Sequence, residues 1–346
     1  MKTDCNVTLR VSAVIAATIA ALAFMPGKAA AAADIFAGKT IKLVVGTGSV
    51  GGYALYGQLA GHHLARFIPG KPTVVVSYMP GAAGLNAMNW LYTVAPRDGT
   101  AIAVTMQELA YQQALGTQGV RYDASRFHYI GRATANVPVH MIWHTAPVRS
   151  FGDLRRQEIV TGAAGSSGIQ VDLPRAQNVL LGTKWKIITG YREAGDRYVA
   201  VERGEIQATM APATLFNEQF KPWREKGLVH IVVQYADFRH PLFPDVQAIT
   251  ELCETQDAKS VFKFLVSTST VGRGYVAPPD VPAEAVRILR DAFDAMVRDP
   301  EFKADAEKRG ADLFPMSGEA LAAYIRDAAA TPPDVIMKVN NVIGSR

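Results

Sequence analysis

One repeating pattern most constrains the fold of this chain. Short apolar runs end in small-residue or glycine-rich turns, and these turns lead into runs with helical spacing. The first apolar run, 41–45, enters the turn 46–52 and then a stretch, 53–67, with an apolar stripe typical of a helix. Strand-like runs recur at 74–77, 101–105, 139–143, 159–161, 185–188, 206–210 and 230–234. Alternation of this kind predicts an α/β fold built from parallel βαβ units.

The first turn has the spacing G-x-G-x-x-G over Gly46, Gly48 and Gly51. A glycine turn at the start of a helix presents backbone N–H groups to an anion. A dinucleotide site also needs an acidic residue about 20 positions later, and the stretch from Ile35 to Arg97 contains no Asp or Glu. An NADP-dependent oxidoreductase that uses the Gly46–Gly51 turn stays open as an alternative, but the acid-free stretch favours a smaller negatively charged ligand.

The N-terminus has the pattern of a secretory signal peptide, which we place at 1–33. Lys2 and Arg10 precede or flank an apolar run over 11–25, and Ala29–Ala33 offers small-residue cleavage sites. The sequence therefore predicts an exported, periplasmic protein. After cleavage the chain keeps a single cysteine, Cys253, and forms no internal disulfide.

A mature chain of about 310 residues favours two lobes over a single core. We expect the first part of lobe 1 at 34–136, lobe 2 at 137–265, and a return to lobe 1 with C-terminal helices at 266–346. In that last segment Asp299-Pro300 separates two helices and Ser317 is a predicted N-cap. The net charge of +5 is spread without a Lys/Arg block, so no nucleic-acid partner is predicted.

Four small-residue turns stand at predicted strand ends, and they are the candidate binding elements: 46–52, 81–84, 162–168 and 190–191. Ligands of open α/β sheets bind outside the carboxyl ends of the strands, so these turns are expected to converge on one crevice. The plainer interpretation is that short βα connections are rich in glycine anyway.

Neither catalysis nor metal binding is predicted. Gly165-Ser-Ser-Gly168 lacks the G-x-S-x-G pattern of a hydrolase nucleophile. His62 and His63 point about 100° apart on a helix, and His140 and His144 lie roughly 13 Å apart on a strand. We therefore expect no catalytic residue, no metal and no cofactor.

The order of several motifs resembles the Bug-type periplasmic solute receptors, the binding subunits of tripartite tricarboxylate transporters. The resemblance rests on Gly48-Ser-Val-Gly51-Gly52-Tyr53, Pro80-Gly81-Ala-Ala-Gly84, Asp98-Gly99, Gly162-Ala-Ala-Gly165-Ser166 and Thr189-Gly-Tyr191. It implies a two-lobe type II periplasmic binding-protein fold whose hinged interlobe cleft closes on a small carboxylate. A di- or tricarboxylate or an aromatic acid is the implied ligand, and integral-membrane transporter subunits are the implied partners. We expect a monomer, and a sensory receptor without a transporter stays open as a second alternative.

The resemblance also implies the binding residues. One carboxylate is held by the two turns of lobe 1, through Ser49, Gly51, Gly52, Tyr53, Gly81, Ala82, Ala83 and Gly84. The distal part of the ligand contacts lobe 2 through Gly165, Ser166, Ser167 and Tyr191.

One position departs from the family pattern. Ala54 stands where the family commonly has Asp, and loss of that acid makes an amino-acid ligand less favourable. The first turn is thus expected to rely on backbone N–H groups with little side-chain charge.

Overall fold

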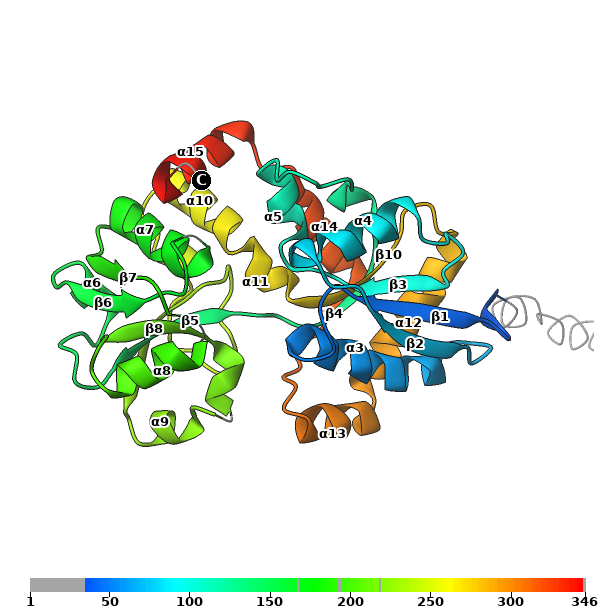
Figure 1. The fold of residues 1–346 in the computed structure, drawn as a ribbon, viewed down its shortest axis with the longest axis horizontal. Coiled ribbons are helices and arrows are strands. Elements are labelled where there is room, and N and C mark those ends of the chain that lie inside the picture. Colours follow the sequence, from blue (N-terminus) through cyan, green and yellow to red (C-terminus); the bar gives the residue numbers. More distant parts are fainter. Residues whose placement is uncertain (1–34, 167, 192–193, 218, 345–346) are drawn as a thin grey trace, which may run out of the picture.

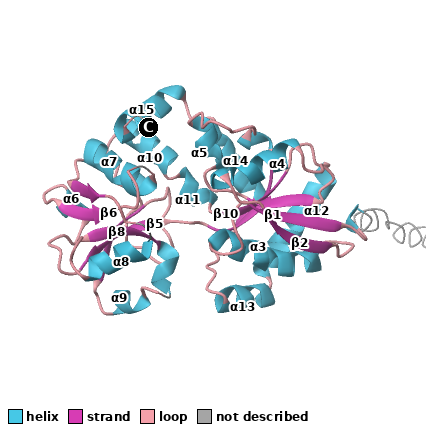
Figure 2. Ribbon diagram, in the orientation of Figure 1, coloured by secondary structure: helices cyan, strands magenta, loops and turns pink. Residues whose placement is uncertain are grey.

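The computed structural model describes residues 35–166, 168–191, 194–217 and 219–344, which form two lobes side by side (Figure 1). Each lobe holds one sheet covered by helices (Figure 2), so the expected two-lobe α/β architecture is confirmed. The predicted signal peptide, 1–33, and Ser167 lie outside the described residues. Within the described ranges, no helix combines the length and the apolar character needed to cross a membrane.

The sheet of lobe 1 has six strands in the order β11-β4-β10-β3-β1-β2. The first three strands in sequence pair in parallel, whereas β10 runs antiparallel to both of its neighbours. The strands are β1 (Thr40–Val45), β2 (Thr73–Tyr78), β3 (Ala101–Val104), β4 (His128–Thr134), β10 (Arg273–Ala277) and β11 (Met316–Ser317).

Helices cover both faces of this sheet. One face packs against α3 (Gly52–His63), η1 (Leu64–Phe67), α12 (Ala283–Arg298) and α13 (Pro300–Lys308). The other packs against η2 (Ala82–Gly84), α4 (Leu85–Thr93), α5 (Leu109–Ala114), η3 (Ala124–Arg126) and α14 (Gly318–Ala329).

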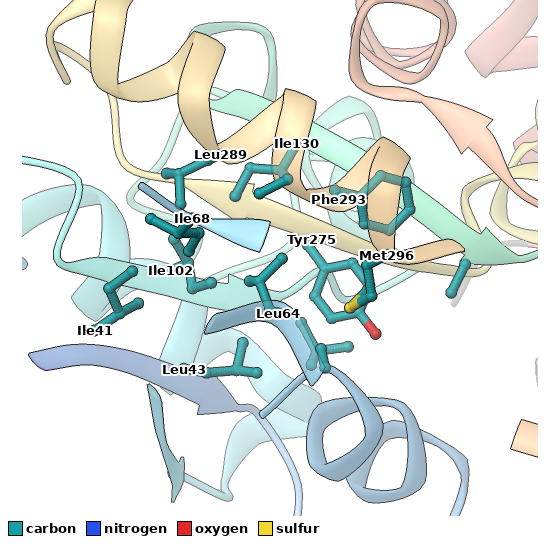
Figure 3. Close-up of a cluster of buried hydrophobic side chains, with 14 of the residues drawn as sticks. Ile41, Leu43, Leu64, Ile68, Ile102, Ile130, Tyr275, Leu289, Phe293 and Met296 are labelled. Atoms are coloured by element: carbon teal, nitrogen blue, oxygen red, sulfur yellow. The ribbon is translucent and has the colours of Figure 1, made fainter. Parts of the chain in front are cut away.

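The main core of lobe 1 joins early strands of the chain to a helix from its C-terminal part. Figure 3 shows Leu43 of β1 and Ile102 of β3 in one cluster with Leu289 and Phe293 of α12. All four side chains are essentially inaccessible to solvent, and burial of each stabilises the fold by about 1.5–3 kcal/mol. The periodic apolar face of α12 thus returns the chain to the lobe in which it began.

The sheet of lobe 2 has five strands in the order β7-β6-β8-β5-β9. Here β6 pairs in parallel with β7 and β8, and β5 runs antiparallel to β8 and β9. The strands are β5 (Pro138–Trp143), β6 (Ile159–Gly162), β7 (Trp185–Ile188), β8 (Ala208–Pro212) and β9 (Val229–Gln234).

Two groups of helices pack on this second sheet. The first group contains α6 (Phe151–Leu154), α7 (Ile169–Leu181), η5 (Ile249–Glu251), α10 (Gln256–Leu265) and α15 (Pro333–Ile343). The second group contains α8 (Ala194–Glu202), η4 (Ala213–Asn217) and α9 (Lys221–Glu225).

The chain crosses between the lobes three times: from β4 to β5, through α11 (Ser267–Val271) into β10, and from α14 to α15. The first two crossings are hydrogen-bonded to each other, because the Asn136 N–H donates to the Ser269 carbonyl at 2.9 Å. At the second crossing Gly272 has φ +51°, and a Cβ there would lie 2.1 Å from the Thr134 carbonyl oxygen. Only glycine fits this close approach without displacing the other crossing.

Two expectations differ from the structure. The sheets are mixed rather than built only from parallel βαβ units, since the strands that enter and leave the hinge run antiparallel to their neighbours. The segment 266–346 also does not return wholly to lobe 1, because α15 packs on α7 and α10 of lobe 2. The predicted cap of α14 is present, with the Ala320 N–H donating to Ser317 Oγ at 3.3 Å.

Candidate functional site

The first glycine turn leads from β1 into the open N-terminal end of a helix. β1 ends at Val45, and α3 begins after Gly51, whose φ is +97° and which makes no side-chain cap. No acidic residue stands in the first turn of α3. Its leading N–H groups have no intrahelical acceptors, so the turn offers donors to an anion without a competing carboxylate.

The second turn lies directly beside the first. β1 and β2 are parallel with Val45 opposite Tyr78, and the Met79 N–H donates to the Val45 carbonyl at 2.8 Å. A Cβ added to Gly46 would lie 3.4 Å from Gly84 Cα. The two turns that the sequence predicted as one clamp are therefore neighbours at the carboxyl edge of the lobe 1 sheet.

The backbone of the second turn is strained. Gly81, Ala82, Ala83 and Gly84 all have positive φ, from +47° to +127°. Alanine rarely adopts this region, and two consecutive alanines there cost of order 1–3 kcal/mol each. Such strain is typical of sites where backbone groups are held in a required direction.

On lobe 2, the predicted residues Gly165 and Ser166 are exposed in the turn that follows β6. The Gly190 N–H donates to the Ala164 carbonyl at 3.0 Å, which holds the Gly190-Tyr191 turn beside it. Tyr191 packs against the end of β6, because a Cβ on Gly162 would lie 3.1 Å from its ring. Ser167 lies outside the described residues.

A cavity of about 560 Å³ opens from lobe 2 next to these turns. Gln170 links the two features, because its side chain lines the cavity and its Oε1 accepts the Ala164 N–H at 3.0 Å. None of the sequence-predicted residues is among the described residues that line this cavity. Its lining consists of Asn136, Pro138, Ile169, Gln170, Ala194, Gly195, Arg197, Tyr198, Met210, Ala211, Pro212, Leu215 and Gln219.

Arg273, at the first position of β10, brings a positive charge to the first turn. Its guanidinium carbon lies 3.9 Å from the centre of the Tyr53 ring, and a Cβ on Gly52 would lie 3.3 Å from its Nε. The expectation that this turn has little side-chain charge is therefore wrong. The sequence holds a signal for Arg273, since it is the sole charged residue between Lys263 and Asp280.

Two amides connect Arg273 to the cavity. Arg273 Nη1 donates to Gln107 Oε1 at 2.7 Å, and Asn136 Nδ2 donates to the same oxygen at 2.9 Å. The Gln107 N–H donates to the Tyr53 hydroxyl at 3.2 Å. Because Asn136 lines the cavity, this hydrogen-bond network links Tyr53 at the first turn to the edge of the lobe 2 cavity.

An acidic residue that sequence analysis did not single out, Glu108, lies beside this network. Glu108 lines a smaller cavity of about 300 Å³ together with Tyr111 of α5 and Ile169 of α7. Burial raises the pKa of its carboxyl group, and the Arg273 charge acts in the opposite direction. Burial is also the main reason that the pKa of Tyr53 is raised.

Two of the histidines considered in the sequence have other partners. His63 packs in lobe 1 with its Nε2 3.0 Å from Asp305 Oδ2. His140 is enclosed in lobe 2, where its ring nitrogens bond to the Tyr235 and Thr161 hydroxyls. Within the ranges the structure describes, no group of three or more His, Cys, Asp or Glu is placed to hold a metal ion.

The family model described as "Tripartite tricarboxylate transporter family receptor" (TctC) matches residues 65–341. The chain belongs to this family. Its members are periplasmic solute-binding receptors, so the resemblance found in the sequence is confirmed and the dinucleotide interpretation is not favoured. A comparison with curated proteins gives no match.

Several solved structures share the fold. A TctC solute binding protein from Polaromonas, without ligand, is 18% identical with a TM-score of 0.70, over 87% of this chain and 98% of its own. A Rhodopseudomonas palustris protein solved with adipate is 17% identical, with a TM-score of 0.58 over 88% and 97%. MatC from Rhodopseudomonas palustris with bound malate is 17% identical, with a TM-score of 0.55 over 88% and 99%.

Proposed function

We propose that this TctC-family chain is an exported receptor that captures a small organic carboxylate between its lobes. The observation that carries the proposal is the adjacency of the two lobe 1 turns, whose backbone N–H groups lie at the start of α3 and in the strained turn 81–84. A carboxylate oxygen is the acceptor that such a cluster of donors recognises. The family and the two neighbours solved with adipate and with malate support the same ligand class.

The proposed site combines both turns of lobe 1 with the turns of lobe 2. Ser49, Gly51, Gly52 and Tyr53, with the turn 81–84, bind one carboxylate. The remainder of the ligand extends toward the lobe 2 cavity, and Gly165, Ser166, Ser167 and Tyr191 contact it as the lobes close. The ligand is a di- or tricarboxylate or an aromatic acid.

The receptor acts in the periplasm after removal of residues 1–33, as a monomer, and delivers its ligand to integral-membrane transporter subunits. It performs no chemical conversion. Family membership supports delivery to a transporter over a purely sensory role. Uptake of the bound acid by cells with and without the receptor gene distinguishes the two, because a sensor affects expression and a receptor affects transport directly.

Thermal unfolding in the presence of an organic-acid panel tests the proposal. The panel includes mono-, di- and tricarboxylates and aromatic acids, with neutral amides of the same carbon skeletons as controls. A specific acid at 100 times its Kd stabilises the folded state by about 2.7 kcal/mol. Stabilisation by an acid and not by its amide is the expected result, and the absence of stabilisation by every acid would overturn the proposal.

A further inference from the structure

Arg273 follows Gly272 of the second crossing between the lobes and lies beside Gly52 of the first turn. Its Nη1 donates a hydrogen bond to Gln107 Oε1 at 2.7 Å, and its second side-chain partner is Tyr53. A guanidinium carries five N–H donors in a planar fork, so donors remain for a ligand. The neighbouring Gly52 has no side chain to separate this fork from the start of α3, because its Cβ position lies 3.3 Å from Arg273 Nε.

The surroundings hold the guanidinium in one orientation. Its guanidinium carbon lies over the Tyr53 ring, 3.9 Å from the ring centre. Gln107 fixes both partners, since its side chain accepts from Arg273 and its N–H donates to the Tyr53 hydroxyl. A preorganised arginine loses less freedom when it binds a carboxylate through two parallel hydrogen bonds.

The charge of Arg273 is not matched by a contact ion pair among the residues described. Glu108 follows Gln107 in sequence and belongs to the same cluster, because its carboxyl group is hydrogen-bonded to the Gln107 and Tyr53 side chains and attracts Arg273. Burial works against the charged form of Glu108. In its charged form Glu108 attracts the guanidinium that a ligand carboxylate would bind, so the two carboxylates compete for Arg273.

We propose that Arg273 is the charged anchor of the ligand carboxylate and that Glu108 weakens binding by competing for it. This inference rests on the proposed function. It adds a side-chain determinant to a clamp otherwise made of backbone N–H groups, and it fixes the orientation of the ligand. The anionic end lies at the hinge beside Gly52, and the rest of the ligand extends past Asn136 into the mostly apolar cavity of lobe 2.

Substitutions that are expected to change Kd in opposite directions test the inference. Kd is measured by calorimetry for the wild type, Arg273→Gln, Arg273→Lys and Glu108→Gln, with the acid from the panel that stabilises the wild type most. Arg273→Gln should weaken binding about 10- to 100-fold, the fold-change expected for a lost charge-assisted hydrogen bond. Arg273→Lys keeps the charge but loses the planar fork of donors, so its Kd should lie between those of the wild type and Arg273→Gln. Glu108→Gln should tighten binding several-fold.

Arg287→Gln is the matched control. Arg287 lies on α12 in exposed ion pairs with Glu284 and Asp291, and its loss should leave Kd unchanged. Thermal unfolding without ligand verifies that each variant is folded. If Arg273→Gln fails to fold, the other two variants still test the inference, because Arg273→Lys should raise Kd and Glu108→Gln should lower it.

Two results overturn the inference while the proposed function stands. Unchanged affinity in Arg273→Gln would show that backbone groups alone hold the carboxylate. Weaker binding in Glu108→Gln would show that Glu108 supports the site rather than competes. If no acid binds the wild type, the proposed function fails and the inference fails with it.

Discussion

His140 and Trp185 stack in the interior of lobe 2, with ring centroids 3.9 Å apart and ring planes inclined by 11°. The imidazole is fully buried on β5, and its nitrogens lie 2.7 Å from the Tyr235 hydroxyl and 2.8 Å from Thr161 Oγ1. No carboxylate is among these partners. Burial therefore lowers the pKa of His140 to about 3.

This burial predicts a loss of stability in acid. In the unfolded chain His140 takes up a proton near pH 6.5, whereas in the folded chain it stays neutral down to about pH 3. The unfolded state thus binds more protons as the pH falls from 6.5 to 3, and each pH unit in that window costs up to about 1.4 kcal/mol. Urea unfolding at pH 4, 5, 6 and 7 measures the effect.

His140→Asn serves as the comparison, because its amide keeps hydrogen-bonding capacity and does not titrate. The stability advantage of the wild type over this variant should shrink steadily below pH 6.5. An advantage that stays constant with pH would contradict the neutral, buried state of His140.

A side chain at Gly52 should block the carboxylate site and leave the fold intact. Gly52 lies in the first turn of α3 with ordinary helical geometry, and its Cβ position meets only the flexible end of Arg273. We expect Gly52→Leu to weaken binding at least about 10-fold with little change in stability, since glycine in a helix is about 1 kcal/mol less favourable than other residues. Calorimetry with the selected acid gives the affinity.

Gly152→Leu in α6 is the control for Gly52→Leu, because its Cβ makes an ordinary contact of 3.7 Å and the helix is remote from the cleft. Normal affinity in Gly52→Leu would move the site elsewhere. Gly81 is less suitable for this test. It has φ +127°, and a Cβ there would lie 2.3 Å from Asn86 Nδ2, so a substitution would strain the turn as well as fill it.

Gly272→Ala should destabilise the hinge. The new Cβ would lie 2.1 Å from the Thr134 carbonyl oxygen at a φ of +51°, and such strain costs roughly 1–3 kcal/mol. Gly48→Ala, where nothing lies within 4 Å and φ is ordinary, should change the free energy of unfolding by less than about 0.5 kcal/mol. Equal stability of the two variants in urea would show that the two crossings separate easily.

Ile343→Ala should destabilise the protein even though it lies near the end of the described chain. Ile343 is 3% exposed in the lobe 2 core, and truncation of a buried isoleucine costs about 2–5 kcal/mol. Met337→Ala on the same helix is the control, because Met337 is 59% exposed. If both variants unfold at the wild-type urea concentration, α15 is not part of the cooperative core.

The strands and turns of both lobes could be predicted from sequence because their signals are local. The runs before Gly46 and Gly162 are apolar and end in glycine, and the structure has β1 and β6 there. The adjacency of the turns 46–52 and 81–84 also follows from parallel pairing of consecutive strands. Local periodicity and turn chemistry were sufficient for these features.

Arg273 and α15 show what local signals leave out. Arg273 reaches Tyr53 only because β10 inserts between β3 and β4, a pairing of segments far apart in sequence. The apolar face of α15 predicts that the helix packs, but it does not specify lobe 1 or lobe 2. Both outcomes depend on long-range contacts, which carry no periodic signature in the chain.

The third crossing places opposite ends of the described chain on different lobes. Phe36 is buried in the core of lobe 1, and Ile343 is buried in the core of lobe 2. Any change in the angle between the lobes therefore changes the distance between these two ends. A donor and an acceptor fluorophore attached beside them would convert ligand capture directly into an optical signal, which would make the receptor a sensor of its own occupancy.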